Sequence, residues 1–379
     1  MSLRDYLYDL ATDRIKGPIP LLLKGFLYLF SFLYAIVVRG LIIFSRLRSF
    51  RLGCKVISVG NITLGGTGKT TLVQLIAEYL KSNGKNPAIL TRGYKKLPKT
   101  ADSSSGQSLI MGDEPFMLQR NLTNIPVIVD SNRIHSAKKA IQDYKADTVI
   151  LDDGFQQWRI KKDLEIVAID AVNPFGNKHL LPRGILREPL CGLKRADVFV
   201  LTKTNFIKDS QGLKSFLAGL NPGALLIESE HSPQYFYELG QPEKPLSLET
   251  FSGKNAALFS GIGDPDSFEK LASGLGLKVG LSFKFADHYN YSQSDLEGIA
   301  RQAKERGMEI LVTTEKDASR LYELRVTNYP DVHLRFSRDP DLYGIARRDE
   351  LRIYILRIAI KIITGKERFY DRIHQLYSL

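Results

Sequence analysis

Cysteine is scarce in this sequence, and low-complexity tracts and internal repeats are absent. Cys54 and Cys191 are the only two cysteines among 379 residues, and their separation matches no metal-binding spacing. We therefore expect a protein of a reducing compartment rather than a disulfide scaffold. With 44% hydrophobic and 25% charged residues, the composition is that of a folded globular protein. The length allows two domains with extensions.

Acidic residues are also in deficit, which gives the chain a formal net charge of +12. A basic protein of this kind favours a negatively charged partner or surface. On charge alone, nucleic acid, anionic lipid and phosphorylated small molecules all remain open. The stretch from residue 39 to residue 55 contains no acidic residue, and its basic residues are Arg39, Arg46, Arg48, Arg51 and Lys55.

An apolar run precedes this basic stretch. Residues 21–38 carry a single charge, at Lys24, and approach the roughly 20 apolar residues that span a bilayer. The run is longer than the apolar core of a signal peptide. Because Lys24, Gly25 and Ser31 weaken a clean span, the pattern favours an in-plane or partly inserted helix with the basic residues at the lipid headgroups. The alternative is a buried helix packed on the domain.

The most informative motif lies in residues 56–80, where an apolar strand, a glycine-rich turn and an amphipathic helix follow one another as VISVGNITLGGTGKTTLVQLIAEYL. The glycines let backbone N–H groups turn toward phosphate oxygens, and the helix adds its positive dipole end. Lys69 would reach the β- and γ-phosphates, and Thr70 would ligate Mg²⁺. Thr63 departs from the motif, which has its first glycine there. The motif predicts nucleotide binding over a ligand-free turn. The residues expected to bind the nucleotide are Gly65, Gly66, Thr67, Gly68, Lys69, Thr70 and Thr71.

Short apolar strands alternate with polar or helical stretches after this loop. The expected strands are 86–94, 125–130, 147–153, 164–170 and 196–203. A helix-like segment, 136–145, lies between two of them. Such a pattern predicts a parallel sheet covered on both faces, with ligands at the carboxyl ends of its strands.

The second half of the chain predicts a smaller α/β domain joined by a short β linker. A further helical stripe is expected in the tail, from Ile353, Leu356, Ile360 and Ile363, and it would dock on a domain or lie on a membrane. The fold class is therefore a P-loop NTPase-like parallel-sheet domain with a second α/β domain and an N-terminal apolar membrane helix. The expected divisions are a membrane-associated helix at 1–50, a P-loop domain at 51–231, linker strands at 232–254, the smaller domain at 255–338 and a basic amphipathic tail at 339–379.

Paired carboxylates end the strand at 147–153. A strand ending in aspartate is the usual second half of a P-loop site, where a carboxylate holds Mg²⁺. Asp152 and Asp153 are therefore candidates for this role, although such a pair is also common on surfaces.

Several other polar residues have both a structural and a functional interpretation. Asp113 opens an expected helix after Gly112 and before a proline, but a carboxylate there could also accept a proton from an acceptor hydroxyl. His288 stands in a tyrosine-rich turn, where a lone histidine is usually structural. Arg183 and Arg187 suit phosphate recognition, and a solvated loop explains them equally well.

Together these segments resemble the tetraacyldisaccharide 4'-kinases of lipid A biosynthesis. The similar segments, in family order, are VGNITLGGTGKTTL, TRGYK, GDEP, LDDGFQ, DLEIVAID, LLPRGILREP and TTEKDA. With the apolar helix they cover residues 20–320. The resemblance implies transfer of the γ-phosphate of ATP, with Mg²⁺, to the 4'-hydroxyl of an acylated glucosamine disaccharide 1-phosphate. It also implies a peripheral or monotopic location on the cytoplasmic face of the inner membrane.

The resemblance further implies roles for individual residues. Asp113 would be the base that acts on the sugar hydroxyl, and Asp153 would pair with His288 to assist it. Asp152 would serve the metal, together with Thr70. The residues expected near phosphate or sugar groups are Arg133, Arg187 and Glu188. A second-domain histidine that reaches the phosphates implies domain closure around the substrate.

Three features depart from the family pattern. Gln157 stands where members often have histidine, Arg183 stands where a small residue is common, and the basic tail after residue 340 is longer than the pattern requires. The departure at Arg183 could alter contacts to the lipid headgroup.

Two other functions compete with the kinase. A membrane-associated ATPase that positions proteins or DNA has a similar loop, but such proteins usually carry a lysine where this chain has Leu64. A nucleic-acid module is disfavoured because the basic residues cluster beside apolar helices rather than among stacking aromatics. We therefore expect no nucleic-acid partner, and the sequence gives no sign of an obligate protein partner.

Overall fold

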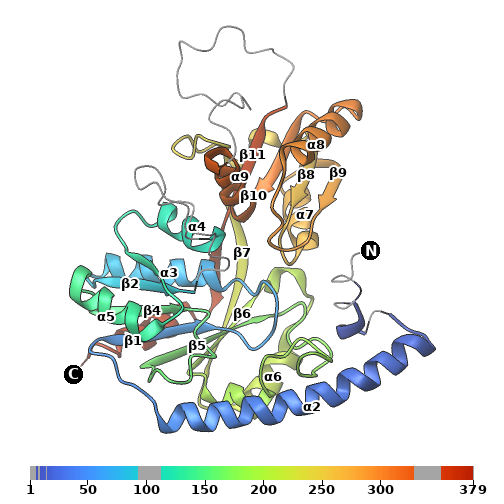
Figure 1. Cartoon of the computed structure of the whole chain (residues 1–379). Helices are drawn as coiled ribbons and strands as arrows, with labels where there is room; N and C mark the ends of the chain where they lie inside the picture. The colour runs from blue at the N-terminus through green and yellow to red at the C-terminus, as the bar shows by residue number, and fades with distance from the viewer. Residues whose placement is uncertain (1–5, 7–8, 14, 93–111, 328–350, 379) are drawn as a thin grey trace. The chain divides into compact units, whose positions relative to one another are not determined.

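The computed structural model describes residues 6, 9–13, 15–92, 112–327 and 351–378 (Figure 1). The chain divides into two compact units, each built from separate segments. Unit 1 comprises residues 1–92, 124–231 and 360–379, and unit 2 comprises residues 93–123 and 232–359. Strands β7 (Leu225–Glu238) and β11 (Ile353–Thr364) cross the boundary between the units and are neighbours in the sheet.

This division differs from the contiguous one expected from the sequence. Residues 93–123 group with unit 2 rather than with the P-loop segments, and residues 360–379 return to unit 1. The expected domain boundary near residue 338 lies outside the described residues. A contiguous division misses such returns because they depend on strand pairing between segments far apart in the chain.

The core of unit 1 is a parallel sheet in the order β3-β2-β4-β1-β5-β6-β7. Its remaining strands are β1 (Lys55–Gly60), β2 (Pro87–Thr91), β3 (Val127–Val129), β4 (Thr148–Asp152), β5 (Leu164–Asp170) and β6 (Val198–Thr202). Each strand expected from the apolar runs is present. Ala88 and Leu90 pack against Ala137 and Ala140 of a covering helix. The alternating residue Ile89 is fully buried as well, so helices cover both faces, as the continuous apolar runs predict.

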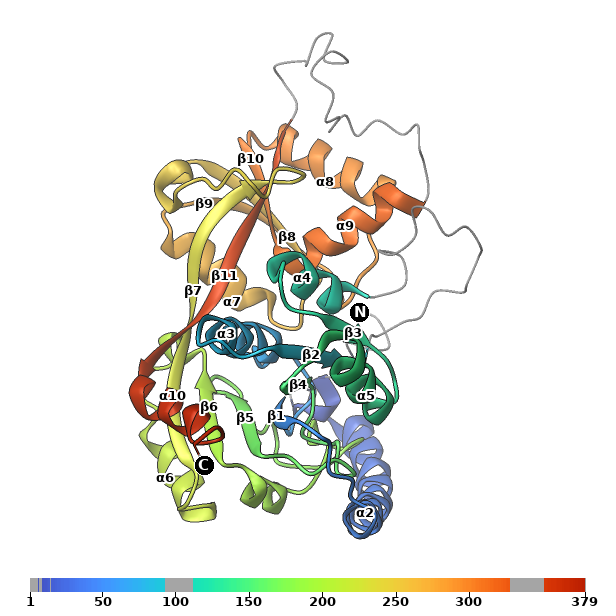
Figure 2. The same cartoon turned by 90° about the vertical axis from the view of Figure 1, so that its left-hand side faces the viewer.

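The helices of unit 1 are α2 (Pro18–Leu47), α3 (Lys69–Ser82), α5 (Arg133–Tyr144), α6 (Gln211–Leu220) and α10 (Lys366–His374), with short 3₁₀ turns at Leu190–Arg195 and Thr204–Phe206. Leu72, Ile76 and Leu80 of α3 recur at helical spacing and are buried. Tyr79 of α3 stacks on Tyr370 of α10, with ring centroids 4.0 Å apart. In Figure 2, strands β1, β5 and β6 lie between α10 and α2.

Unit 2 has its own parallel strands in the order β11-β10-β8-β9, and its core joins both helices and strands. Its elements are α4 (Asp113–Asn121), a 3₁₀ turn at Leu248–Phe251, β8 (Asn255–Ser260), α7 (Pro265–Gly274), β9 (Lys278–Lys284), α8 (Gln293–Glu305), β10 (Ile310–Thr314) and α9 (Glu315–Thr327). Leu296 and Ile299 of α8 pack with Leu311 of β10 and Leu321 of α9. The αβ alternation expected for this region is confirmed.

The expected helical stripe in the tail is wrong. Residues 353–364 form strand β11, which pairs in parallel with β10, for example Leu311 with Ile353. The isoleucine-rich run IYILRIAIKII suits a pleated strand, because β-branched side chains are stiff at χ1 and pack well across a sheet. A short apolar run carries no reliable period of its own, so pairing with β10 decides its structure.

Candidate functional site

The P-loop connects β1 to α3 in unit 1. Gly68 precedes the first residue of α3 with φ +78°, a left-handed conformation that favours glycine. A Cβ atom on Gly68 would lie 3.0 Å from Nε2 of His231 and 3.6 Å from Thr202, so a larger residue would crowd His231 and strain the backbone. The Thr202 hydroxyl donates to the Thr67 carbonyl at 3.1 Å. The described structure shows no side-chain cap on α3, and its first N–H groups can therefore face a phosphate.

The missing first glycine of the motif has a structural explanation. Thr63 is buried and forms an isolated antiparallel bridge with Leu186. The N–H of Leu64 donates to the Ile185 carbonyl at 2.8 Å. The start of the P-loop is therefore extended and held against the LREP segment, a conformation that threonine adopts readily.

Lys69, Asp153 and Arg187 form a charged cluster at the carboxyl end of β4. One Nη of Arg187 lies 2.9 and 2.8 Å from the two carboxylate oxygens of Asp153. The Nζ of Lys69 lies 3.5 Å from Oδ1 of Asp153. Burial by itself would raise the pKa of Asp153, but the charges of Lys69 and Arg187 outweigh it and hold the pKa below its usual range. The φ of Asp153, +55°, is uncommon outside glycine and asparagine-like residues.

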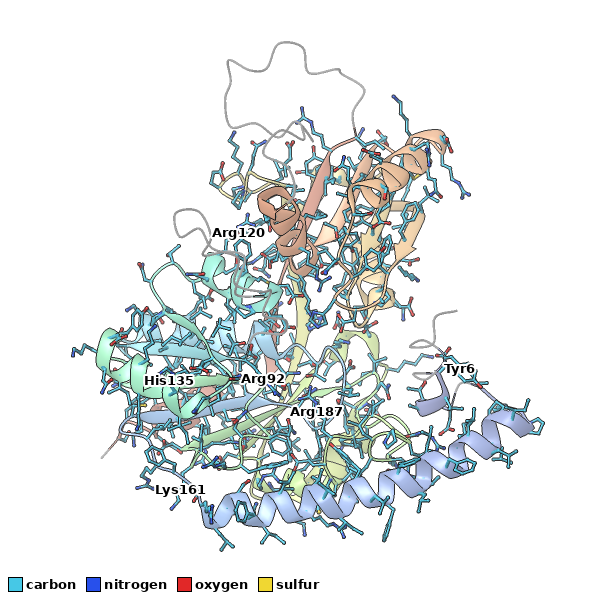
Figure 3. All side chains as sticks on the ribbon, in the orientation of Figure 1. Tyr6, Arg92, Arg120, His135, Lys161 and Arg187 are labelled. Carbon is cyan, nitrogen blue, oxygen red and sulfur yellow. The ribbon has the colours of Figure 1, made fainter. Side chains whose placement is uncertain are left out.

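Asp152 lies one residue before this cluster and is buried. It pairs in register with Val59 of β1, the strand that leads into the P-loop, so it ends its strand at the same sheet edge. An Nη of Arg133, itself buried, lies 3.4 Å from the Asp152 carbonyl. Figure 3 labels Arg187 and also Arg92, which follows β2 at this carboxyl edge. A carboxylate and the Thr70 hydroxyl are donor types that Mg²⁺ prefers.

Glu188 occupies a different setting from Arg187. Its side chain is fully buried and accepts hydrogen bonds from Gln156 at 3.0 Å and from Arg195 at 2.9 Å. Gln156 also donates to the Asn61 carbonyl, at 3.0 Å. Glu188 thus ties the LREP segment to the start of the P-loop.

A second cluster of charges lies in unit 2, at the start of α4. The Asp113 carboxylate accepts from Nδ1 of His288 at 2.8 Å and from Nε and Nη2 of Arg320 at 3.0 and 2.6 Å, all on Oδ2. Burial would raise the pKa of Asp113, but the hydrogen bond from His288 and the charges of Arg320 and Lys316 hold the pKa well below its usual range. Helix α4 begins at Asp113, which confirms the helix-start interpretation, and the functional role of Asp113 stays a prediction.

The structure brings together some of the expected site residues and leaves others apart. In unit 1 it joins Lys69 with Asp153 and Arg187, and in unit 2 it joins Asp113 with His288. Asp153 and His288 belong to different units and each has a charged partner within its own unit. Their pairing therefore stays a prediction.

Arg320 is a site residue that the sequence did not single out. It follows the family segment TTEKDA by two positions, and its guanidinium also contacts Asp317 of that segment at 2.9 Å. The only signal in the sequence was that segment. Nothing in the spacing of that segment indicates that α9 packs against α4. Arg320 of α9 lies 207 residues after Asp113 of α4 in the chain.

Helix α2 turns two serines inward and most of its large apolar residues outward. The hydroxyl of Ser31 donates to the Leu180 carbonyl at 2.8 Å. The buried residues of α2 are Ser31, Val38 and Ser45. The exposed large apolar residues on it are Ile19, Leu21, Leu22, Leu23, Phe26, Tyr28, Leu29, Phe30, Phe32, Leu33, Ile36, Val37, Leu41, Ile43, Phe44 and Leu47. Figure 1 shows it as one long helix along unit 1. This arrangement excludes the buried-helix alternative.

By length and composition alone, α2 is long and apolar enough to cross a membrane, and 11% of its most apolar window is buried. It is the one such helix among the described residues. This weakly indicates association with a membrane.

The departure at Arg183 lies beside α2. Its guanidinium contacts both carboxylate oxygens of Asp13, at 2.9 and 3.0 Å. Lys24 of α2 reaches the same carboxylate at 2.6 Å. Arg183 is buried, and it joins the LREP-side loop to the residues before α2.

Fold and site together define a P-loop nucleotide-binding protein of the parallel α/β class. Residues 23–345 match the model of the tetraacyldisaccharide-1-P 4'-kinase family, and the chain belongs to this family. It is 40% identical to the tetraacyldisaccharide 4'-kinase of Syntrophus aciditrophicus over 72% of this chain and 77% of that one. With the enzyme of Elusimicrobium minutum the identity is 35% over 85% of this chain and 82% of that one.

A solved structure agrees with these relatives. The crystal structure of LpxK from Aquifex aeolicus in complex with ATP matches with a TM-score of 0.68 and 26% identity, over 94% of this chain and 100% of that one. The chain is therefore an ATP-dependent kinase that phosphorylates the 4'-hydroxyl of an acylated glucosamine disaccharide 1-phosphate in lipid A biosynthesis. The fold class, the family and the kinase activity expected from the sequence are confirmed, and the two competing functions are not supported.

Proposed function

We propose that the P-loop of unit 1 binds the triphosphate of ATP and that the Asp113–His288 pair of unit 2 activates the acceptor hydroxyl. The observation that carries the second part is the 2.8 Å contact between Nδ1 of His288 and Oδ2 of Asp113. The backbone N–H groups of residues 65–71 and the start of α3 surround the phosphates. Lys69 stabilises the charge that develops on the transferred phosphoryl group.

Thr70 and Asp152 are the residues that would hold Mg²⁺. The fit rests on the burial of Asp152 and on its register with Val59, the strand end next to the P-loop. Bound there, Mg²⁺ would neutralise negative charge on the β- and γ-phosphate oxygens. Arg133 supports this edge of the sheet through its contact with the Asp152 carbonyl.

Asp153 and Arg187 position Lys69, the side chain that acts on the phosphates in this proposal. Asp153 lies between Lys69 and Arg187, so one carboxylate reduces the repulsion between two positive charges that both favour a phosphate. Arg187 remains available to the γ-phosphate or the sugar through its other N–H groups. Glu188 contributes by holding the segment that carries Arg187.

The surroundings of Asp113 revise its expected role. A carboxylate that accepts three charge-assisted or polar hydrogen bonds on one oxygen, with its pKa held well below the usual range, is a weak proton acceptor at neutral pH. Asp113 instead accepts the Nδ1–H of His288, and Nε2 of His288, which lies 3.7 Å from Oδ2 of Asp287, takes the hydroxyl proton. The hydroxyl oxygen then forms its bond to the γ-phosphorus while the bond to the β–γ bridging oxygen breaks, and ADP leaves.

One γ-phosphate and one hydroxyl must meet groups from both units during this reaction. Catalysis therefore includes closure of the units around ATP and the lipid, as the resemblance implies. In this proposal Asp153 and His288 remain a pair that acts during the reaction.

The lipid acceptor and the exposed apolar residues of α2 support a location at a bilayer. The outward apolar residues of α2 enter the acyl boundary, and the basic residues from Arg39 to Lys55 meet anionic headgroups. Because ATP is cytoplasmic, the location is the cytoplasmic face of the inner membrane, bound peripherally or monotopically. The proposal needs neither a nucleic acid nor an obligate protein partner.

The test is phosphate transfer from labelled ATP to the acylated disaccharide 1-phosphate in detergent. Asp113→Asn and His288→Ala should each lower kcat by about 10²- to 10⁴-fold and leave the KM for ATP nearly unchanged. The double variant should be little worse than the poorer single variant, because the two residues act as a unit. Asp143→Asn, on the exposed face of α5, is the matched surface control. Additive defects, or near wild-type kcat in either single variant, would remove the pair from the mechanism.

A further inference from the structure

Arg320 makes an unusually complete set of contacts for a buried arginine. Its Nε and Nη2 donate to Oδ2 of Asp113 at 3.0 and 2.6 Å. Its Nη1 donates to the Gly261 carbonyl at 2.8 Å and to Oδ1 of Asp317 at 2.9 Å. Its side chain is 4% exposed. All three nitrogens are thus engaged, and the planar fork of the guanidinium fixes the direction of each bond.

Asp317, which accepts a hydrogen bond from Nη1 of Arg320, is held as firmly. Asp317 is fully buried and accepts from the N–H of Gly261 at 2.8 Å and from the hydroxyl of Tyr291 at 2.9 Å. Its other oxygen accepts from the Thr314 hydroxyl at 2.6 Å. Because Asp317 cannot turn without losing these bonds, Arg320 has one orientation. That orientation aims two N–H groups at Asp113.

We propose that Arg320 is a positioning residue of the kinase reaction. It fixes the Asp113 carboxylate so that Oδ2 faces Nδ1 of His288, which sets the tautomer and ring orientation of His288. This inference rests on the proposed role of the Asp113–His288 pair. It assigns to unit 2 a chain of four side chains in which Asp317 holds Arg320, Arg320 holds Asp113, and Asp113 orients His288.

The charge of Arg320 has a second effect on the same histidine. A carboxylate beside an imidazole favours the protonated ring, and a nearby cation opposes that effect. Arg320 shares the Oδ2 atom with His288, so its charge partly balances the carboxylate beside the imidazole. The other ring nitrogen of His288, Nε2, lies 3.7 Å from Oδ2 of Asp287. The charged groups that face this pair are Glu114, Asp287, Lys316, Asp317 and Arg320.

A purely structural role for Arg320 makes a different prediction. Helices α4 and α9 are also joined by the ion pair of Glu114 and Lys316, at 2.8 Å. If Arg320 served only to join the helices, its loss would lower thermal stability and leave kcat per folded enzyme and its pH profile unchanged. A positioning role instead changes both of these kinetic quantities.

The experiment measures kcat against pH, by lipid phosphorylation, for wild type, R320Q, R320K and R352Q. Arg320→Gln removes the charge and the fork. We expect the plateau of kcat to fall about 10- to 100-fold, the scale of a misplaced catalytic group, and the acid limb to move up by about one pH unit. Arg320→Lys keeps the charge and most of the volume, so its plateau should fall while the acid limb stays. Arg352, an exposed partner of Glu238, is the control, and R352Q should match wild type.

A further measurement keeps the inference testable if R320Q folds poorly. The tautomer of His288, followed by NMR of its ring nitrogens in the full-length enzyme, should be single in the wild type and mixed in R320K, and in R320Q where that variant folds. A wild-type plateau in R320K and R320Q, or lower stability without any kinetic change, would overturn the inference. His288→Ala separates the two levels: an active His288→Ala enzyme would refute the proposed pair itself, whereas an impaired one beside wild-type Arg320 variants would refute Arg320 alone.

Discussion

The hydroxyl of Tyr34 in α2 donates a 2.7 Å hydrogen bond to the backbone carbonyl of Arg187. The guanidinium of Arg187 in turn holds Asp153, and Asp153 lies beside Lys69 of the P-loop. A helix with an outward apolar surface is thus linked by consecutive contacts to the lysine proposed to act on the phosphates. The apolar helix and the lysine of the P-loop are therefore connected within unit 1.

Tyr34→Phe should lower kcat by about 2- to 10-fold, since a typical hydrogen bond contributes about 0.5–1.5 kcal/mol. The KM for ATP should change little, because the nucleotide-binding loop itself is intact. Steady-state kinetics at fixed detergent concentration give both values. Tyr144→Phe, an exposed tyrosine of α5, is the matched control. Equal kcat in the two variants would show that the Tyr34 hydrogen bond does not matter for catalysis.

Replacing exposed apolar residues of α2 should release the protein from membranes. The chosen variant changes Leu22, Phe26, Leu29 and Leu33 to Gln, all of which are exposed, so the contacts of Ser31 and Tyr34 with unit 1 remain. Each removed apolar side chain weakens insertion into the acyl boundary. Membrane and soluble fractions are compared, and ATP binding checks the fold. Full membrane retention would instead assign the anchor to the basic residues alone.

Asp152→Asn should raise the Mg²⁺ concentration needed for half-maximal activity by about 10-fold or more. An amide retains the shape of the side chain but loses the negative charge that a divalent cation requires. The measurement is a Mg²⁺ titration of lipid phosphorylation at saturating ATP. Asp143→Asn should leave the titration unchanged. An unaltered Mg²⁺ requirement in Asp152→Asn would transfer the metal role to another residue.

Acid should loosen the tie between α2 and its supporting loop. Burial by itself would raise the pKa of Asp13, but hydrogen bonds from Lys24, Arg183 and Asn177 lower it from 3.8 to about 2. A depressed pKa in the folded state means that this stabilisation is complete above about pH 4 and is lost as pH falls toward 2.

Hydrogen exchange of residues 177–187 reports the loosening directly. Exchange should accelerate between pH 4 and pH 2 beyond the intrinsic rate in the wild-type protein. Asp13→Asn should show the faster exchange already at pH 5, with no further acid-dependent step. The idea fails if both proteins keep the same protection across this range.

Local patterns explain why much of the molecule was predictable. The P-loop of residues 63–71 and the strand ending in Asp152 each consist of residues that are consecutive in the chain. Their glycines, β-branched runs and charges indicate their structure without reference to the rest of the chain. The start of α4 at Asp113 follows from its proline and acidic first turn. The tail was mistaken for a helix because a run such as 353–364 has no local feature that outweighs its pairing with β10.

The sequence by itself determined the nucleotide site, the αβ alternation and the family, since each depends on residues close together in the chain. Tertiary structure alone decided which face of α2 turns outward, because the Tyr34 and Ser31 contacts involve partners about 150 positions away. The tertiary structure also decided which side chains contact Asp113. The bonds from Arg320, 207 residues distant, arise only when α9 packs on α4, and a carboxylate's proton affinity depends on the charges that folding brings around it.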